Sequence, residues 1–187
     1  MHRCGWAGTD ELYVRYHDEE WGKPVHDDRI LFEFLMLEGA QAGLSWITVL
    51  RKRENYRQAY DGFDPEKVAA YGEEKVEELL NNPGIIRNRL KVRASIKNAK
   101  LFLQIQKEFG SFDQYLWSYV NFKPVVGDWA EYTQAPCRTE LSDRISKDLK
   151  KRGFSFVGST IIYSYLQAIG VVDDHENACI CRQNMAT

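Results

Sequence analysis

A cluster of possible metal ligands stands near the end of the chain. The stretch DDHENACICR contains His175, Cys179 and Cys181, although the 187 residues include only four histidines and four cysteines. Imidazole nitrogens and cysteine thiolates are the ligands that Zn²⁺ prefers, and a structural zinc site has four of them in a tetrahedron. The cluster therefore predicts part of a zinc site whose other ligands lie elsewhere in the chain.

The other ligands are predicted at the beginning of the chain. Cys4 and His17 supply one thiolate and one imidazole. Together with His175 and Cys179 they make a Cys₂His₂ set with no open position for a water, so the role of the metal would be structural. If the chain is helical here, Cys179 shares a face with His175 and is favoured over its competitor Cys181. Spacing alone leaves incidental residues as an alternative, because twelve residues separate the first pair.

A second group of chemically active residues surrounds Glu38. This acid ends the apolar stretch RILFEFLMLE and is followed by the tight turn Gly43-Leu44-Ser45. It is either a paired surface group or a functional acid. Aromatic side chains concentrate in the same part of the chain, at Trp6, Tyr13, Tyr16, Trp21 and Trp46. Most aromatic residues belong to cores, but with one acid they also suit a pocket for a flat, electron-poor ring such as a cationic purine.

Basic residues gather in two segments that each contain a glycine turn. No acid occurs from Leu79 to Lys107, and this stretch includes the turn NPGIIRNR. In KKRGFSFVGST, three basic residues precede a hairpin framed by Gly153 and Gly158. Backbone N–H groups at such turns and at helix N-termini bind phosphate, so the segments predict contacts to the DNA backbone without base readout. A solvated helix face is the alternative interpretation of the first segment.

Composition limits the class of protein. Hydrophobic residues make up 44% and charged residues 28% of the chain, and no apolar run is long enough to cross a membrane. The first residues show no export signal, so we expect a cytoplasmic protein with thiols rather than disulfides. The net charge of −2 does not itself suggest a nucleic-acid partner.

Helical periodicity and capping residues predict a mainly α fold. Asp27 and Asp28 are expected to cap the helix that leads to Glu38. Residues 121–138, which contain two prolines, are expected to be a loop, and no strand pattern is evident. Further helices are predicted from Pro65 to Ala70 after an Asp64 cap, at 73–81, at 88–109 before Gly110, at 111–120 after a Ser111 cap, at 139–152 after a Thr139 cap, and at 159–170.

Six motifs of the sequence together resemble the bacterial 3-methyladenine DNA glycosylase I family. They are RCGW, YHDEEWG, LEGAQAGLSWITVLRKRENYR, GIIRNR, KKRGFSFVGSTIIYSYLQAIG and DH…C, in this order, and the likeness runs from Met1 to about Cys181. The resemblance implies a helix-hairpin-helix DNA glycosylase fold. Residues 1–187 would then form one domain of two helical lobes, with both termini packed on one structural Zn²⁺.

The resemblance also implies roles for individual residues. Glu38 matches the catalytic acid that hydrogen-bonds the extruded base. Tyr16 matches a second base contact and Trp46 the stacking platform, with Trp6 and Tyr13 as pocket walls. The metal ligands of the family match Cys4, His17, His175 and Cys179. The expected DNA contacts are Gly43, Leu44, Lys151, Gly153 and Gly158.

The implied reaction is the removal of 3-methyladenine from alkylated double-stranded DNA by a monomeric enzyme. The base would be flipped out, its N-glycosidic bond hydrolysed, and free 3-methyladenine released from an abasic site. Residues 159–164 contain no lysine, so Schiff-base chemistry is not expected. Asp173 and Asp174 are candidates for activating the water. Two alternatives remain: a zinc-stabilised DNA-binding module without catalysis, and a zinc enzyme that acts on a small molecule.

Overall fold

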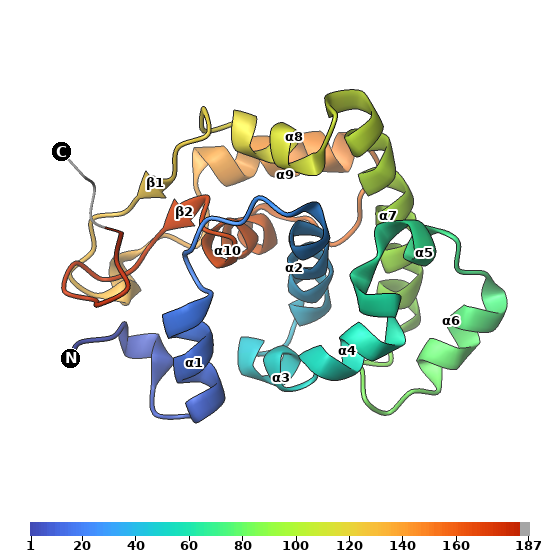
Figure 1. Cartoon of the computed structure of the whole chain (residues 1–187), viewed down its shortest axis with the longest axis horizontal. Helices are drawn as coiled ribbons and strands as arrows, with labels where there is room; N and C mark the ends of the chain where they lie inside the picture. Colours follow the sequence, from blue (N-terminus) through green and yellow to red (C-terminus); the bar gives the residue numbers. More distant parts are fainter. Residues whose placement is uncertain (184–187) are drawn as a thin grey trace.

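Helices make up most of residues 1–183, which are the residues that the computed structural model describes. In chain order the elements are η1 (Gly5–Ala7), α1 (Glu11–Glu19), α2 (Asp28–Gln41), α3 (Trp46–Arg51), α4 (Arg53–Ala59), η2 (Asp61–Phe63), α5 (Pro65–Ala69), α6 (Glu73–Leu80), α7 (Arg89–Phe109), α8 (Phe112–Ser118), β1 (Val125–Val126), η3 (Tyr132–Gln134), α9 (Glu140–Lys151), α10 (Ser159–Ala168) and β2 (Val172–Asp173). Helix α2 lies in the middle, between α10 and α7 (Figure 1). No helix in this part of the chain is long and apolar enough to cross a membrane.

Polar caps begin the helices where the sequence predicts them. The side chains of these residues accept hydrogen bonds from first-turn N–H groups: Asp27, Asp64, Asn88, Ser111 and Thr139. Asp28 has a different role from the predicted one. Its carboxylate accepts the N–H groups of Phe112 and Asp113, both at 2.9 Å, and so caps α8 and fixes it to α2.

Helix α2 is the buried helix that its apolar sequence predicts. Nine of its residues are buried, including Leu31, Phe34, Leu37 and Glu38. Because apolar residues surround the whole circumference, the helix packs on all sides and holds its few polar side chains inside the protein. The carboxyl group of Glu38 is thereby fixed in the interior.

The expectation of a strand-free loop at 121–138 is wrong at one place. Val125 and Val126 form β1, which pairs in parallel with Val172 and Asp173 of β2. Two residues are too few to show the alternation by which strands are recognised. The pairing holds the segment after α10 in an extended conformation, and this segment carries the C-terminal cysteine and histidine cluster.

The two ends of the described chain lie side by side. The N–H of Ile180 donates to the carbonyl of His2 at 3.0 Å. The carboxylate of Glu176 accepts the N–H of Gly5 at 3.0 Å and lies 2.6 Å from Nε2 of His2. Direct hydrogen bonds therefore already connect the ends of the chain around the predicted metal ligands.

Candidate functional site

A hollow of about 200 Å³ lies among α1, α2, α3 and α10, and we name it the aromatic pocket. All five residues assigned to base binding by the family resemblance line it: Trp6, Tyr13, Tyr16, Glu38 and Trp46. The remaining lining residues are Trp21, Gln41, Tyr132, Ala135, Ser164, Gln167 and Asp174. The fold thus collects side chains from distant parts of the sequence into one concave site.

Glu38 is buried in the aromatic pocket and is not a paired surface group. Only 3% of the residue is exposed, and its Oε2 has no hydrogen-bond partner. Burial raises the pKa of Glu38 to about 8. An unpartnered buried carboxyl is destabilising, so its presence in a pocket indicates a ligand that supplies the missing donor or charge.

Aromatic rings and free indole N–H groups form the walls around this acid. The rings of Tyr16 and Trp46 lie 5.6 Å apart, and those of Trp6 and Tyr13 lie 4.9 Å apart. Nε1 of Trp6 and Nε1 of Trp46 are buried without a partner. Within residues 1–183, these two atoms, Oε2 of Glu38 and Nε2 of His175 are the buried polar side-chain atoms that lack a partner. The pocket contains three of the four, which is typical of a site prepared for a polar ring.

The turn between α2 and α3 presents Leu44 beside the pocket. Gln41 and Trp46, which flank the turn, both line the pocket, while Leu44 is 40% exposed. Gly43 has φ of +80°, a conformation that favours glycine. Ser45 occupies the N-cap position of α3, but its hydroxyl bonds the hydroxyl of Thr48 rather than a backbone N–H. The turn therefore places an apolar side chain at the surface next to the pocket.

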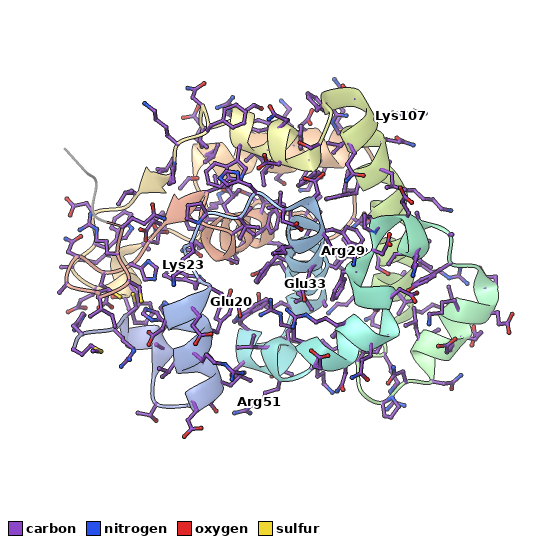
Figure 2. The ribbon with its side chains drawn as sticks, in the orientation of Figure 1. Glu20, Lys23, Arg29, Glu33, Arg51 and Lys107 are labelled. Atoms are coloured by element: carbon purple, nitrogen blue, oxygen red, sulfur yellow. The ribbon has the colours of Figure 1, made fainter. Side chains whose placement is uncertain are left out.

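Arg53 connects three helices behind the pocket, a role that no sequence motif signals. Its Nη1 donates to both carboxylate oxygens of Glu20 at 2.8 Å, and its Nε donates to Glu33 at 3.3 Å. Figure 2 labels Glu33 on α2 and Glu20 near the end of α1. The guanidinium also lies 5.0 Å from the ring of Phe34, which stacks on Trp46 with centroids 6.4 Å apart. This network fixes α1, α2 and α4 relative to one another.

Only one of the two candidate aspartates faces the pocket. Asp174 lines it and accepts hydrogen bonds from Trp129 and Gln167, each at 2.8 Å, and from the hydroxyl of Tyr163. The carboxylate of Asp173 lies 2.6 Å from Nδ1 of His175 instead. Asp173 thus supports the histidine and does not line the pocket, and its role in activating a water stays a prediction.

A cluster of metal-ligating side chains lies behind the pocket. Ligand atoms of His17, His175, Cys179 and Cys181 all lie within 4.8 Å of one another. Nδ1 of His17 is 2.8 Å from Asp18, just as Nδ1 of His175 is bonded to a carboxylate. Such carboxylates orient metal-binding imidazoles and leave the Nε2 atoms free for the metal. Nε2 of His175 is buried without a partner, and a metal ion held by these residues would satisfy it.

This cluster contains three of the four predicted ligands, with Cys181 in the place of Cys4. Cys4 nevertheless adjoins it, because its backbone N–H donates to Nε2 of His17 at 3.4 Å and its sulfur accepts the N–H of Glu176 at 3.3 Å. The sulfur of Cys181 lies 3.9 Å from the other nitrogen of His17, Nδ1, which already bonds Asp18. Nε2 of His17, the nitrogen that does not bond Asp18, thus faces Cys4 and Cys179.

The helical turn used to choose between the two C-terminal cysteines is absent. Residues 176–182 form successive turns rather than a helix, with the N–H of Cys179 donating to the carbonyl of Glu176 at 2.9 Å. The expected helix is therefore wrong, and both Cys179 and Cys181 approach the cluster. What distinguishes them is burial: Cys179 is 7% exposed, whereas Cys181 is partly exposed.

The cluster of histidine and cysteine side chains and the aromatic pocket share a wall. The ring of His17 lies 5.2 Å from that of Trp6, and the ring of His175 lies 4.7 Å from that of Trp21. Tyr16 and His17 are adjacent in α1, the first lining the pocket and the second the cluster. An ion that orders the two histidines would therefore also order one side of the pocket.

Comparisons with known proteins agree with this geometry. The model of the family described as methyladenine glycosylase matches residues 6–183. The chain belongs to this family. DNA-3-methyladenine glycosylase 1 of Escherichia coli (strain K12) is 53% identical over 97% of this chain and 97% of its own length. DNA-3-methyladenine glycosylase of Haemophilus influenzae is 49% identical over 96% of this chain and 97% of its own length. The resemblance seen in the motifs, and with it the expectation of a DNA glycosylase, is confirmed.

Solved structures confirm the mainly α fold of this methyladenine glycosylase. A crystal structure of 3-methyladenine DNA glycosylase I is 51% identical, with a TM-score of 0.94 over 97% of this chain and 100% of that chain. A structure that concerns 3-methyladenine recognition by 3-methyladenine DNA glycosylase I from Staphylococcus aureus has a TM-score of 0.95 at 37% identity, over 100% and 99% of the two chains. The structural match covers nearly the whole length of each protein.

The hairpin of the methyladenine glycosylase joins α9 to α10, as the sequence predicts. Gly153 has φ of +102°, and Gly158 precedes α10 without a side-chain cap. The first N–H groups of α10 therefore have no capping side chain and can bind an anion. Lys151 is exposed at the end of α9.

Several basic side chains of residues 79–107 are paired with acids or carbonyl groups in the folded protein. Arg89 pairs with Glu77 at 2.8 Å, and Arg93 pairs with Glu73 at 2.7 Å. Lys91 turns inward and bonds the carbonyls at the end of α2. For the two arginines, the solvated helix face is the better interpretation, because α6 supplies the acids that are missing from the run itself.

Part of the pocket lining consists of residues that the sequence does not mark as functional. Gln41, Tyr132, Ser164 and Gln167 line it but belong to no recognisable chemical pattern. Ser164 and Gln167 are three positions apart on α10, so they share a helix face, and that spacing is a signal available in the sequence. Tyr132 lies in the segment expected to be a loop, and only the folded position of that segment reveals its role.

Proposed function

We propose that the protein is a monofunctional DNA glycosylase that hydrolyses the N-glycosidic bond of 3-methyladenine in alkylated double-stranded DNA. It acts in the cytoplasm as a monomer of helix-hairpin-helix type, flips the base into the aromatic pocket, and leaves an abasic site. The observation that carries the proposal is the unpartnered carboxyl of Glu38 inside a wall of tyrosine and tryptophan rings. The names of relatives at 53% and 49% identity support the substrate.

The chemistry of the substrate fits such a pocket. Methylation at N3 gives the base a positive charge while it is still bound to the sugar, so the leaving group is activated before the enzyme acts. The enzyme has to extract the base, which costs a few kcal/mol and less for a damaged pair. A strong general acid is unnecessary because the departing base already carries the charge.

Selectivity follows from the charge of the base. Trp46 stacks on the ring and attracts a cation through its π face. The cation favours the ionised form of Glu38, which accepts hydrogen bonds from the base. Neutral adenine offers no such compensation, so in its presence the buried carboxyl stays protonated or bears an uncompensated charge. As the bond breaks, positive charge moves to the sugar, which carboxylate and phosphate groups stabilise, and a water attacks C1′.

The donor set behind the pocket fits one structural zinc ion. Cys4, His17, His175 and Cys179 would hold it, with carboxylates of Asp18 and Asp173 orienting the imidazoles. When bound, the ion supplies no step of the reaction and serves to order the ends of the chain, since four protein ligands leave no open position. Its two histidines in turn hold Trp6 and Trp21 in the pocket wall.

The surfaces next to the pocket contact the DNA in this proposal. Leu44, on the turn with Gly43, enters the space that the flipped nucleotide vacates. The hairpin framed by Gly153 and Gly158 binds a phosphate with the uncapped N–H groups of α10, and Lys151 adds a nearby positive charge. The turn and the hairpin flank α2, which carries the acid between them.

The pKa of Glu38 predicts how activity depends on pH. Because burial raises it to about 8, the empty pocket holds a protonated acid at lower pH, whereas a cationic base requires the carboxylate. We expect kcat/KM to rise by roughly fiftyfold from about pH 6 to about pH 8 and then to level off, since kcat/KM reports ionisation of the free enzyme. Base release at low substrate concentration measures this profile. A flat wild-type profile would show that Glu38 does not need to ionise.

A strand-cleavage assay tests whether the enzyme is monofunctional. Methylated duplex DNA is incubated with the protein and then analysed on a denaturing gel with and without alkali. We expect intact strands that break only after alkali, because an abasic site is alkali-labile and no lysine lies at 159–164 for Schiff-base chemistry. Strand breaks without alkali, together with covalent trapping by borohydride, would contradict hydrolysis by water alone.

A further inference from the structure

Helix α7 and the hairpin between α9 and α10 form a surface outside the aromatic pocket. Leu90, Arg93 and Lys97 of α7 line a shallow hollow together with Ser155 and Phe156 of the hairpin. We name it the α7 groove. No residue of the aromatic pocket belongs to it, and it contains neither the turn at Leu44 nor the glycines that frame the hairpin.

Helix α7 joins this groove firmly to the hairpin. The side-chain amide of Asn98 donates to the carbonyl of Ser155 at 2.9 Å, and its oxygen accepts the N–H of Ser155 at 3.0 Å. Phe156 has φ of +57°, an uncommon conformation for a residue with a side chain, and it packs beside Gly39 of α2. The hairpin is thereby held in a defined position against α7 and α2.

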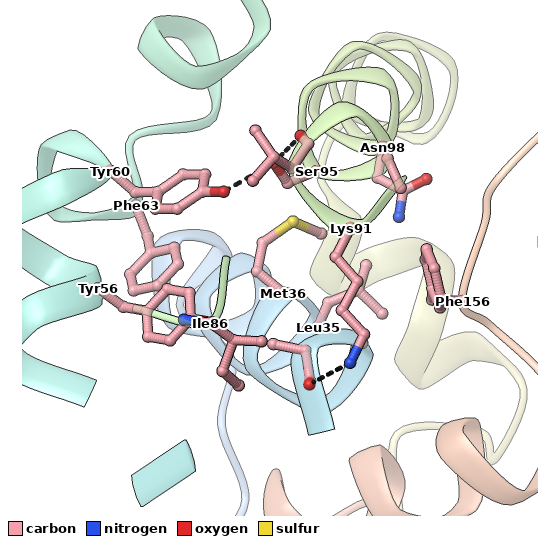
Figure 3. A pocket seen from close by; sticks show the side chains of 14 residues that line it. Leu35, Met36, Tyr56, Tyr60, Phe63, Ile86, Lys91, Ser95, Asn98 and Phe156 are labelled. Carbon is pink, nitrogen blue, oxygen red and sulfur yellow. Dashed lines mark hydrogen bonds between the residues drawn. The ribbon is translucent and has the colours of Figure 1, made fainter. Parts of the chain in front are cut away.

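The same helix also holds the turn that carries Leu44. Nζ of Lys91 donates to the carbonyls of Ala40 and Ala42, at 2.9 Å and 2.8 Å. Figure 3 shows Lys91, Asn98 and Phe156 lining the same pocket, with one of the two bonds from Lys91 drawn. The turn, the hairpin and α7 therefore form one rigid surface, and the α7 groove continues the face to which the proposed function assigns the DNA.

Two side chains of the groove suit a nucleic-acid backbone. Leu90 is 73% exposed, more than any other large apolar residue of the described chain except Met1. Lys97 is exposed, and its Nζ bonds only the hydroxyl of Ser155, at 2.6 Å. Within residues 1–183, Lys97 forms no ion pair, whereas its neighbour Arg93 is paired with Glu73. Lys97 thus offers an uncompensated positive charge beside an exposed apolar side chain.

We propose that the α7 groove binds the sugar-phosphate backbone of duplex DNA that extends past the hairpin. Lys97 binds a phosphate and Leu90 packs against the adjoining sugars. This inference rests on the proposed function, because the groove lengthens the DNA contact beyond the flipped base. The groove adds affinity for any duplex, damaged or not, and does not read the sequence.

The test measures duplex binding and base binding separately. Fluorescence anisotropy with an undamaged labelled duplex gives the duplex Kd at several salt concentrations, and tryptophan fluorescence gives the Kd of free 3-methyladenine. We expect Lys97→Gln to weaken duplex binding by about fivefold and to reduce the slope of log K against log salt by about 0.9, as for the loss of one phosphate contact. Leu90→Ser should weaken duplex binding by roughly threefold at an unchanged salt slope. Neither change should alter the Kd of 3-methyladenine.

Two further variants distinguish a phosphate contact from other roles. Lys97→Arg keeps the positive charge, so it should leave the duplex Kd within about twofold of wild type. Lys107→Gln removes an exposed lysine of the same helix that lies near its far end (Figure 2), and it should have little effect. The inference is overturned if Lys97→Gln behaves like Lys107→Gln, or if Lys97→Arg loses as much affinity as Lys97→Gln, which would show that the charge is not what binds. Base release from methylated DNA is measured on the same preparation. If the wild-type protein releases no base, the proposed function fails, whatever the duplex Kd values of the variants are.

Discussion

Glu38→Gln is expected to lower kcat/KM for 3-methyladenine release from methylated DNA by about 10²–10³-fold, the size of effect seen when one preorganised electrostatic group is removed. Glutamine keeps the shape of the side chain and its hydrogen-bonding oxygen but cannot ionise toward a cationic base. Initial rates on methylated duplex DNA measure the effect. Release at the wild-type rate would refute the role of this acid.

Glu33→Gln is the matched control for this substitution. Glu33 is another buried acid of α2, 6% exposed, but it pairs with Arg53 and Arg57 and does not line the pocket. Its replacement should lower the thermal stability while leaving kcat/KM within about threefold, because removing one partner of a buried pair destabilises the fold rather than the transition state. A comparable loss of activity in both variants would point to a general disturbance of α2.

The stability of the Glu38→Gln variant should change with pH in a defined direction. The pKa of Glu38 is about 8 in the folded protein, whereas the ordinary value of 4.5 applies to the unfolded chain. Between these values the unfolded chain is ionised and the folded chain is protonated, so the contribution of Glu38 to stability falls as pH rises. Glutamine lacks this dependence, and the Tm of the variant relative to wild type should therefore increase from about pH 5 to about pH 9. This result also verifies that the variant is folded.

Loss of the metal is expected to have the second large effect. Purified protein should contain one zinc ion per chain, and Cys4→Ser or His175→Ala should remove it. The Tm should then fall by about 10 °C or more, since losing a structural metal destabilises by several kcal/mol and 1 kcal/mol corresponds to about 2–4 °C for a chain of this size. Elemental analysis and thermal unfolding measure the two quantities.

Cys181→Ser is the control that decides between the candidate thiols. Because the sulfur of Cys181 lies beside the nitrogen of His17 that bonds Asp18, we expect this variant to keep the zinc ion and nearly all of its stability. The affinity for free 3-methyladenine should decrease in the metal-free variants, whose pocket wall at Trp6 and Trp21 is no longer held, and remain unchanged in Cys181→Ser. Zinc retained in Cys4→Ser but lost in Cys181→Ser would assign the fourth ligand to Cys181.

Local physical chemistry made much of the fold predictable. Asp64 followed by proline, Ser111 and Thr139 each satisfy free N–H groups of a first turn, and such capping depends only on neighbours in the sequence. Long-range use of the same chemistry was not predictable in this way. Asp28 looks like a cap for its own helix but caps α8, 84 residues later in the chain.

The candidate site was predictable as far as family motifs and residue types reach. Glu38 and the aromatic residues were found because an acid after an apolar helix is unusual, but its burial and missing partner are properties of the folded chain. The position of Cys181 could not be derived because the C-terminal segment forms turns, whose side-chain directions follow no fixed period. The ion pairs of Arg89 and Arg93 were likewise not predictable, because their partners Glu77 and Glu73 belong to α6 and precede the basic run in the sequence.

The most direct test of the central claim is to identify the bases that the protein releases. Duplex DNA treated with a methylating agent is incubated with the wild-type protein or with Glu38→Gln, and the soluble fraction is separated by chromatography. We expect free 3-methyladenine from the wild type and little from the variant. Binding of the duplex without release of any base would contradict the central claim and indicate a DNA-binding module without catalysis.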